Sequence, residues 1–471
     1  MEDTGMINGT PVRQESRKLW QYLASISACM LVVGIGTALA WTSPVLPQLY
    51  LKDSFMVLSR EEGSWVGSLL PLGAIVGALP AGAMADKLGR KKSLLLLAVP
   101  FLISWTMILL ARIVCLLYDG RFIVGIAVGA GCVLVPTYVS EISEVSTRGT
   151  LGAMFQLFLT VGIFLAFVLG SALCYTLFAG FCALVIITFL ATFYWMPESP
   201  VWLVGKGRKR EAKEALSKLR GDAYDPTQEL NEMQTEADES AGRKASLRDM
   251  LKSPVHRKAM LASFAMMVFQ QASGINAVIF FTVEIFQAAG SSMKPELSSI
   301  LVAFVQLVMS GVAALIVDRA GRKPLLMIST GVMSVSLILL GYYFKVRHYG
   351  GDTGSIGWLP LVSLVVFMVF FSIGLGPIPW MLMGELFSAE TKAVASSLAV
   401  TLNWFMVFVV TKLFQPLSDM LGSHVTFWIF AAIMAGATAF TYFLVPETKG
   451  KTYPEIQAML LGNGRKTKTL A

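Results

Sequence analysis

The ten residues Phe269-Gln270-Gln271-Ala272-Ser273-Gly274-Ile275-Asn276-Ala277-Val278 lie near the middle of the chain and explain much of the rest. They fall within an apolar run, about 259–286, that is long enough to cross a bilayer. A polar group without a partner in hydrocarbon costs about 2–7 kcal/mol. We therefore expect the amides of Gln270, Gln271 and Asn276 to face a water-filled or ligand-filled cavity. The alternative is that they join neighbouring helices.

The chemistry and spacing of these amides give a second expectation. A carboxamide donates and accepts hydrogen bonds without carrying charge, which suits a neutral solute rich in hydroxyl groups. On an ideal helix, at about 100° per residue, Gln271 and Asn276 point about 140° apart. Both can reach one ligand only if the helix is broken between them, and Ser273-Gly274 is the expected place. Broken helices near the middle of the membrane are typical of transporters.

The composition is that of a membrane protein. Of 471 residues, 55% are hydrophobic and 14% are charged, and the mean hydropathy is +0.65, whereas soluble proteins have about 25% charged residues. Apolar stretches of about 20 residues recur twelve times, which predicts an all-α membrane protein with twelve transmembrane helices. The first stretch contains Pro44 and Pro47, so we expect it to end in a bent helix.

The distribution of positive charge predicts the topology. With both termini in the cytosol, the inner segments hold 30 Lys and Arg residues and the outer loops hold 6. The net charge of +8 then serves topology and contact with anionic lipid rather than nucleic acid. The predicted parts are a cytosolic segment (1–20), a six-helix bundle (21–196), a cytosolic helical linker (197–258), a second six-helix bundle (259–445) and a cytosolic tail (446–471).

Short motifs repeat between the two halves of the chain. Asp86-Lys87-Leu88-Gly89-Arg90-Lys91 recurs as Asp318-Arg319-Ala320-Gly321-Arg322-Lys323, and Pro197-Glu198-Ser199 recurs as Pro446-Glu447-Thr448. Glu141 is followed seven residues later by Arg148, just as Glu385 is followed by Lys392. Two repeats of six spans in the same orientation imply two bundles related by an axis along the membrane normal, with a site between them.

The repeated charges fall where the spans reach the inner side. Paired there, they would hold the outward-open state together and separate when the inner side opens. The alternative is a set of solvated loop charges that only fix topology, at about 0–1 kcal/mol per exposed pair. The candidate cytosolic gate residues are Asp86, Arg90, Glu141, Arg148, Glu198, Asp318, Arg322, Glu385, Lys392 and Glu447.

Taken together, the motifs resemble the sugar porters of the major facilitator superfamily over nearly the whole chain. They include Gly120-Arg121-Phe122, Pro136-x-Tyr138-x-x-Glu141, Gln270-Gln271-x-Ser273-Gly274-Ile275-Asn276, Gly376-Pro377-Ile378-Pro379-Trp380 and Asn403-Trp404. The pattern is closest to insect facilitated trehalose transporters and related facilitative glucose transporters. The resemblance implies the major facilitator fold, transport of a sugar, and a span that is irregular at Pro377 and Pro379 and forms a candidate gate hinge.

The resemblance also implies roles for individual residues. Sugar porters hydrogen-bond or stack on the sugar at the positions of Gln156, Gln270, Gln271, Asn276, Trp380, Asn403 and Gln306. Trp380 presents a flat apolar face and one N–H donor, although it could instead be a packing tryptophan. The sequence departs from the familiar glucose carriers at Gln306, which replaces Asn, at Ser372, which replaces Glu, and at Lys392, which replaces Arg.

No cofactor, metal or energy source is indicated. No nucleotide-binding loop, metal-ligand spacing or nucleophile–base constellation is present, so an enzyme is not expected. Proton-coupled relatives keep a carboxylate in the first span, whereas this chain has no Asp or Glu between Glu15 and Asp53. Glu284 is the one acid inside a span-like run.

We therefore expect a facilitative transporter of trehalose or a hexose such as glucose, which acts by alternating access. The alternatives are a proton-coupled sugar symporter that uses Glu284, and a sugar receptor that binds without transport. The expected location is the cell membrane, and the expected working form is a monomer. The sequence leaves monosaccharide and disaccharide substrates open.

Overall fold

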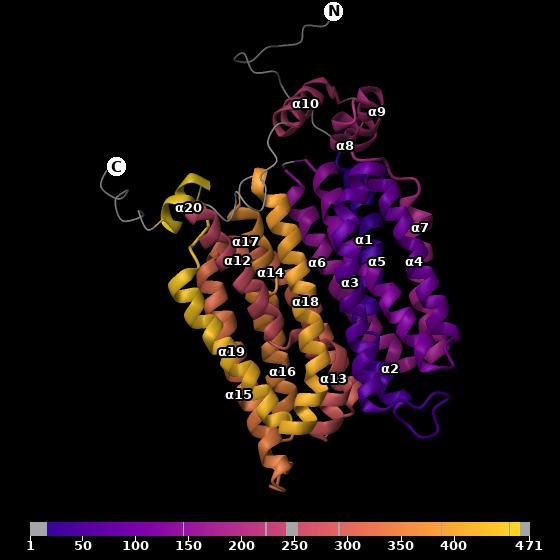
Figure 1. Cartoon of the computed structure of the whole chain (residues 1–471), viewed down its shortest axis with the longest axis vertical. Helices are drawn as coiled ribbons and strands as arrows, with labels where there is room; N and C mark the ends of the chain where they lie inside the picture. The colour runs from indigo at the N-terminus through magenta and orange to yellow at the C-terminus, as the bar shows by residue number, and fades with distance from the viewer. Residues whose placement is uncertain are drawn as a thin grey trace, which may run out of the picture.

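The computed structural model describes residues 17–144, 146–221, 224–241, 253–290, 293–387, 389–451 and 453–461. Within these ranges, twelve helical segments are long and apolar enough to cross a bilayer. The prediction of an all-α membrane protein with twelve spans is confirmed. The long helices run side by side along the long axis of the molecule (Figure 1).

The first six spans are built from seven helices. The first span is divided at Trp41 into α1 and α2, although Trp41 keeps helical backbone angles, φ -53° and ψ -38°. Glycines let α3 and α5 approach closely, because a side chain on Gly77 would collide with the backbone oxygen of Ile126. The helices are α1 (Leu19–Ala40), α2 (Thr42–Leu49), α3 (Arg60–Leu88), α4 (Arg90–Leu110), α5 (Val114–Ile142), α6 (Arg148–Ala172) and α7 (Tyr175–Phe193).

The second six spans contain two interrupted spans. One is made of α12 (Pro254–Ala272) and α13 (Ile275–Ala289). The other is made of α16 (Leu359–Phe370), the π-helix η2 (Phe371–Leu375) and α17 (Ile378–Glu385). The remaining spans are α14 (Pro295–Ala320), α15 (Arg322–His348), α18 (Ala389–Leu421) and α19 (Ser423–Leu444).

Short helices gather at one end of the molecule, which we call the linker end (Figure 1). They are α8 (Pro200–Gly205), α9 (Lys209–Arg220), α10 (Thr227–Ala241) and α20 (Tyr453–Leu460). Helices α8, α9 and α10 fall within the segment 197–258, which the sequence predicts as a helical linker. The opposite end, which we call the loop end, carries the turns that follow α2 and the short helix η1 (Gly354–Ile356).

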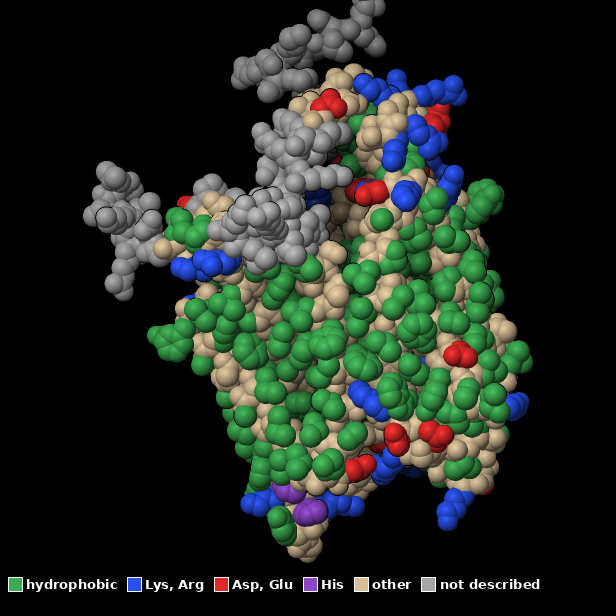
Figure 2. Space-filling model, in the orientation of Figure 1, with side chains coloured by type: hydrophobic (Ala, Val, Ile, Leu, Met, Phe, Trp, Pro, Cys, Tyr) green, Lys and Arg blue, Asp and Glu red, His purple; other side chains and the backbone are tan. Residues whose placement is uncertain are grey.

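The surface is consistent with a bilayer around the long helices. Hydrophobic side chains cover the middle of the molecule, while Lys and Arg side chains gather toward both ends (Figure 2). Many of these apolar side chains are more than half exposed, as on Leu110, Leu184 and Leu315. Exposed apolar surface on this scale is unusual for a protein in water and is typical of a surface that lipid covers.

The two halves of the chain meet along α3 with α18 and α6 with α14. The hydrogen bonds that join described residues across the halves lie toward the loop end. There, the Ser43 hydroxyl accepts from the Val283 N–H at 3.2 Å, and the Ser64 hydroxyl donates to the Lys412 carbonyl at 3.1 Å. The Gln415 amide also donates to the Tyr50 hydroxyl at 3.2 Å. The structure is therefore closed at the loop end.

Candidate functional site

The predicted break at Ser273-Gly274 is present. Helix α12 ends at Ala272 and α13 begins at Ile275. Gly274 has φ +85°, a left-handed conformation that favours glycine, and a Cβ atom there would lie 2.7 Å from the ring of Phe430. The Ser273 hydroxyl donates to the Gln270 carbonyl at 2.7 Å and so satisfies a group that the break exposes.

The break brings the amides into one network. The Gln271 side chain donates to Asn403 Oδ1 at 2.6 Å and to Gln270 Oε1 at 3.3 Å. The Asn276 amide nitrogen donates in turn to Gln271 Oε1. Residues from α12, α13 and α18 thus share hydrogen bonds. Gln271 and Asn276 would point about 140° apart on a regular helix, and the break between α12 and α13 lets their side chains meet.

Gln270 has a structural task that the sequence did not reveal. Its amide nitrogen donates to the carbonyls of Leu375 at 2.8 Å and Gly376 at 2.7 Å. In a regular helix the Leu375 carbonyl would accept from residue 379, but Pro379 has no N–H. Gln270 therefore satisfies the backbone that the proline leaves unpaired, and only its amide oxygen remains to serve a ligand. The irregular span expected at Pro377 and Pro379 is confirmed.

Several predicted ligand residues keep unused hydrogen-bonding groups. Asn276 is half-buried, and neither its Oδ1 nor the Nδ2 of Asn403 bonds to a described residue. The side-chain amides of Gln156 and Gln306 likewise make no hydrogen bond within the described ranges. Trp380 is 41% exposed. The structure thus joins Gln270, Gln271, Asn276 and Asn403, while Gln156, Gln306 and Trp380 stand outside that network.

The charged motifs form a cluster at the linker end of the first half. The Arg90 guanidinium donates to the Glu141 carboxylate at 2.9–3.1 Å and to Asp86 at 3.0 Å. The Glu198 carboxylate accepts from the backbone N–H groups of Arg90 and Lys91, each at 2.9 Å. These bonds connect α3, α4 and α5 to the segment that leads into α8.

The second half repeats this cluster. The Arg322 guanidinium donates to the Glu385 carboxylate at 3.1–3.2 Å, and Glu447 accepts from the N–H groups of Arg322 and Lys323 at 3.1 Å. Burial raises the pKa of Glu447, but the backbone N–H donors outweigh burial and hold that pKa below its ordinary value. Each cluster lies within one half of the chain.

Of the predicted gate residues with described side chains, Arg148 does not join a cluster. Glu141 pairs with Arg90 of α4 and not with Arg148, which is exposed and forms no ion pair with a described residue. The side chains of Asp318 and Lys392 lie outside the described residues. The sequence analysis did not identify two hydroxyl groups that bind the gate carboxylates. The Ser199 hydroxyl donates to Glu141, and the Thr448 hydroxyl donates to Glu385 at 2.5 Å. Ser199 and Thr448 each follow a Pro-Glu pair, and this repetition between the halves could have identified both hydroxyl groups.

Glu284 lies at the closed loop end. Its carboxylate accepts from the Gln415 amide at 3.1 Å, and that amide also reaches Tyr50 in the first half. The second carboxylate oxygen of Glu284 is buried without a hydrogen-bond partner among the described residues. The acid therefore belongs to the contact between the halves.

Two sets of helices around a polar centre, with matching charge clusters, define the class of major facilitator transporters. The chain belongs to the sugar transporter family, since the model described as "Sugar (and other) transporter" matches residues 3–460. The fold also resembles a solved proton:xylose symporter of the major facilitator superfamily, XylE, with a TM-score of 0.75 and 26% identity over 94% of this chain and 99% of that one.

Curated relatives include facilitated trehalose transporters of insects. The protein of Bombyx mori is 37% identical over 98% of this chain and 92% of its own length, and that of Culex quinquefasciatus is 39% identical over 96% and 88%. The protein of Drosophila mojavensis is 38% identical over 96% of this chain, which spans about half (53%) of that relative's length. These relatives are named as transporters, which agrees with the class that the motifs resemble.

Proposed function

We propose that the protein is a facilitative transporter that moves a sugar, either trehalose or a hexose such as glucose, down its gradient by alternating access. The observation that carries the proposal is the network of uncharged amides from α12, α13 and α18, which retains unused donors and acceptors. Neutral hydroxyl groups match these amides, whereas a charged solute would lack a counter-charge in the network. The insect relatives named as trehalose transporters support the same substrate class.

Gln271, Asn276 and Asn403 are the proposed central ligands. Gln306 and Trp380 of the same half and Gln156 of the first half would complete the site. Gln270 both supports the irregular backbone before α17 and offers its amide oxygen. The irregular segment from η2 to α17 would act as the gate hinge, since it lacks the hydrogen bonds that stiffen a regular helix.

The proposed topology places the linker end in the cytosol, together with both termini, because Lys and Arg residues concentrate there. The structure then represents a state closed toward the outside. The domain limits proposed from the sequence apply, with bundles at 21–196 and 259–445 and a linker at 197–258. The cell membrane is the proposed location, and a monomer is the proposed working unit.

The charge clusters at the linker end would control closure on that side. Each holds its own helices together in the present state, and the exposed Arg148 forms no ion pair with a described residue, so it is available for contacts between the halves when that side closes. Asp318 and Lys392, which the repeated motifs predict as gate residues, are proposed to take part as well. Such contacts would be made in the outward-open state and released in the state described here.

Uptake by proteoliposomes tests the proposal. Radiolabelled trehalose should enter vesicles that contain the protein and show counterflow, with competition by glucose reporting the preferred sugar. Absence of counterflow in vesicles that bind the sugar would favour a receptor instead.

The second candidate is a proton symporter, which the buried carboxylate of Glu284 favours. An imposed pH gradient should leave the plateau of sugar uptake unchanged for a facilitative carrier. A plateau that rises with the gradient in the native protein, and not in Glu284→Gln, would establish coupling.

A further inference from the structure

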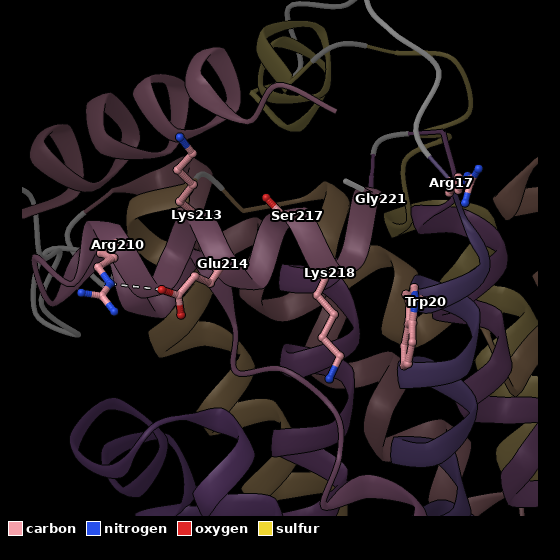
Figure 3. Close-up of a pocket in the computed structure, with 8 residues that line it drawn as sticks. All are labelled: Arg17, Trp20, Arg210, Lys213, Glu214, Ser217, Lys218 and Gly221. Carbon is pink, nitrogen blue, oxygen red and sulfur yellow. Dashed lines mark hydrogen bonds and ion pairs between the residues drawn. The ribbon is translucent and has the colours of Figure 1, made fainter. Parts of the chain in front are cut away.

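A basic pocket at the linker end has no part in the proposed sugar pathway. It lies between the start of α1 and helix α9 and has a volume of about 560 Å³ (Figure 3). Four of its lining residues are cations and one is an acid, Glu214, whose carboxylate already accepts from the Arg210 guanidinium at 3.1 Å. The lining residues are Arg17, Trp20, Arg210, Lys213, Glu214, Ser217, Lys218 and Gly221.

The wall of the pocket is held in place by the backbone. The Arg17 N–H donates to the Arg220 carbonyl at 2.7 Å. Gly221 has φ +96°, and a Cβ there would lie 3.3 Å from the Cβ of Arg17, so glycine permits this close approach. Residue 17 is thereby fixed against the end of α9.

Helix α9 itself is anchored to the first half of the chain. The Arg220 side chain is fully buried, pairs with Glu229 at 2.8 Å and Glu144 at 3.3 Å, and donates to the Ile142 carbonyl at 2.9 Å. Because α9 is anchored in this way, the helix that carries most of the cations of the pocket is held in a fixed position beside the first half of the chain.

The pocket borders the surface that would contact lipid. The Lys218 ammonium lies 5.1 Å from the centre of the Trp20 ring and donates to the Trp195 carbonyl at 2.7 Å. Lys218 extends toward the transmembrane helices beside Trp20, whereas Lys213 lies on the opposite side of α9 (Figure 3). Aromatic and basic residues together are typical of the boundary between hydrocarbon and water.

Helix α1, which contributes Trp20 to the pocket, also carries an exposed apolar face. Leu19, Leu23 and Ile26 recur at helical spacing and are 66%, 39% and 38% exposed. A ligand in the pocket would therefore have cations around it and, on the same helix as Trp20, an exposed apolar face.

We propose that this pocket binds the phosphate group of an anionic phospholipid, whose acyl chains lie along Leu19, Leu23 and Ile26. Arg and Lys side chains bind phosphate oxygens, and the Ser217 hydroxyl adds a neutral donor. A bound phosphate would bridge α1 and α9 and tighten the linker on the first half. A soluble phosphate shares the head-group chemistry but cannot use the apolar face. The inference depends on the proposed cytosolic orientation and not on sugar transport.

Native mass spectrometry of the purified full chain in detergent tests this site. The probes are phosphatidylinositol 4-phosphate, phosphatidylcholine, and soluble inositol 1,4-bisphosphate. Arg17→Gln/Lys218→Gln removes the two lining cations that flank Trp20 (Figure 3), and Lys206→Gln/Lys209→Gln removes the same charge at residues that do not line the pocket. The pocket variant should bind the anionic lipid about 30-fold more weakly, whereas the matched variant should change its affinity by less than about twofold. The soluble head group should bind at least about tenfold more weakly than the lipid.

Equal losses in the two variants, or no loss in the pocket variant, would overturn the assignment. Equal affinity for the soluble head group and the lipid would show a free-phosphate site instead. If the double variant does not fold, Arg17→Gln alone tests the same wall, because its backbone N–H still reaches Arg220. No sugar is present in these measurements, so their failure and that of the transport proposal are distinguishable.

Discussion

Replacing Gln271 with alanine tests the proposed sugar site most directly. The Gln271 amide donates to Asn403 and Gln270 and accepts from Asn276, so the change removes three hydrogen bonds from the centre of the network. A buried polar group that loses its partner costs about 1–3 kcal/mol. Because the sugar hydroxyl and the remaining amides then lack this partner, we expect the Kd for the sugar to rise about 5–150-fold.

Isothermal titration of the purified protein with trehalose and with glucose measures this loss. Gln287→Ala is the matched control, since Gln287 is exposed on α13 and its side chain makes no hydrogen bond with a described residue. Thermal unfolding of both variants separates a loss of binding from a loss of folding. An unchanged Kd in a folded Gln271→Ala protein would refute the assignment of this amide to the sugar.

Three further predictions follow from the geometry. Gly274→Ala should lower the Tm, because the left-handed conformation costs about 1–2 kcal/mol for alanine and its Cβ would meet the Phe430 ring, whereas Gly436→Ala, which has open space, should not lower it. Glu385→Gln should slow sugar exchange several-fold without weakening binding, since it removes the charge paired with the Arg322 guanidinium; normal exchange would count against a gating role. The depressed pKa of Glu447 means that its contribution to stability is present above the ordinary carboxyl pKa and is lost as pH falls through the lower folded value. The Tm difference between the native protein and Glu447→Gln should therefore shrink on acidification, and a constant difference would contradict it.

The linear sequence was sufficient for features that depend on neighbouring residues. The twelve spans follow from runs of apolar residues matched to bilayer thickness, and the break between α12 and α13 follows from Ser273-Gly274 beside three costly amides. The repeated Pro-Glu motifs predicted matching places for Glu198 and Glu447, and each accepts from the backbone N–H groups of the two residues that begin a span, Arg90 and Lys91 or Arg322 and Lys323.

Partners far apart in the sequence could not be predicted, because the rotation and tilt of each helix decide which side chains meet. Glu141 has Arg148 nearby in the sequence but pairs with Arg90, which the packing of α4 on α5 brings to it. Contacts between other elements likewise placed Gln270 of α12 against the carbonyls before α17 and buried Arg220 of α9 against Glu144.

The local pattern of apolar, amide and charged residues thus determined the number of spans and the broken helix, and it indicates the class of solute that we propose. Tertiary structure alone decided which amides share hydrogen bonds, which charges pair, and that the halves close at the loop end. The reason is physical: burial and helix breaks are set by a residue and its neighbours along the chain, whereas a hydrogen bond between helices requires two distant side chains within about 3 Å of each other.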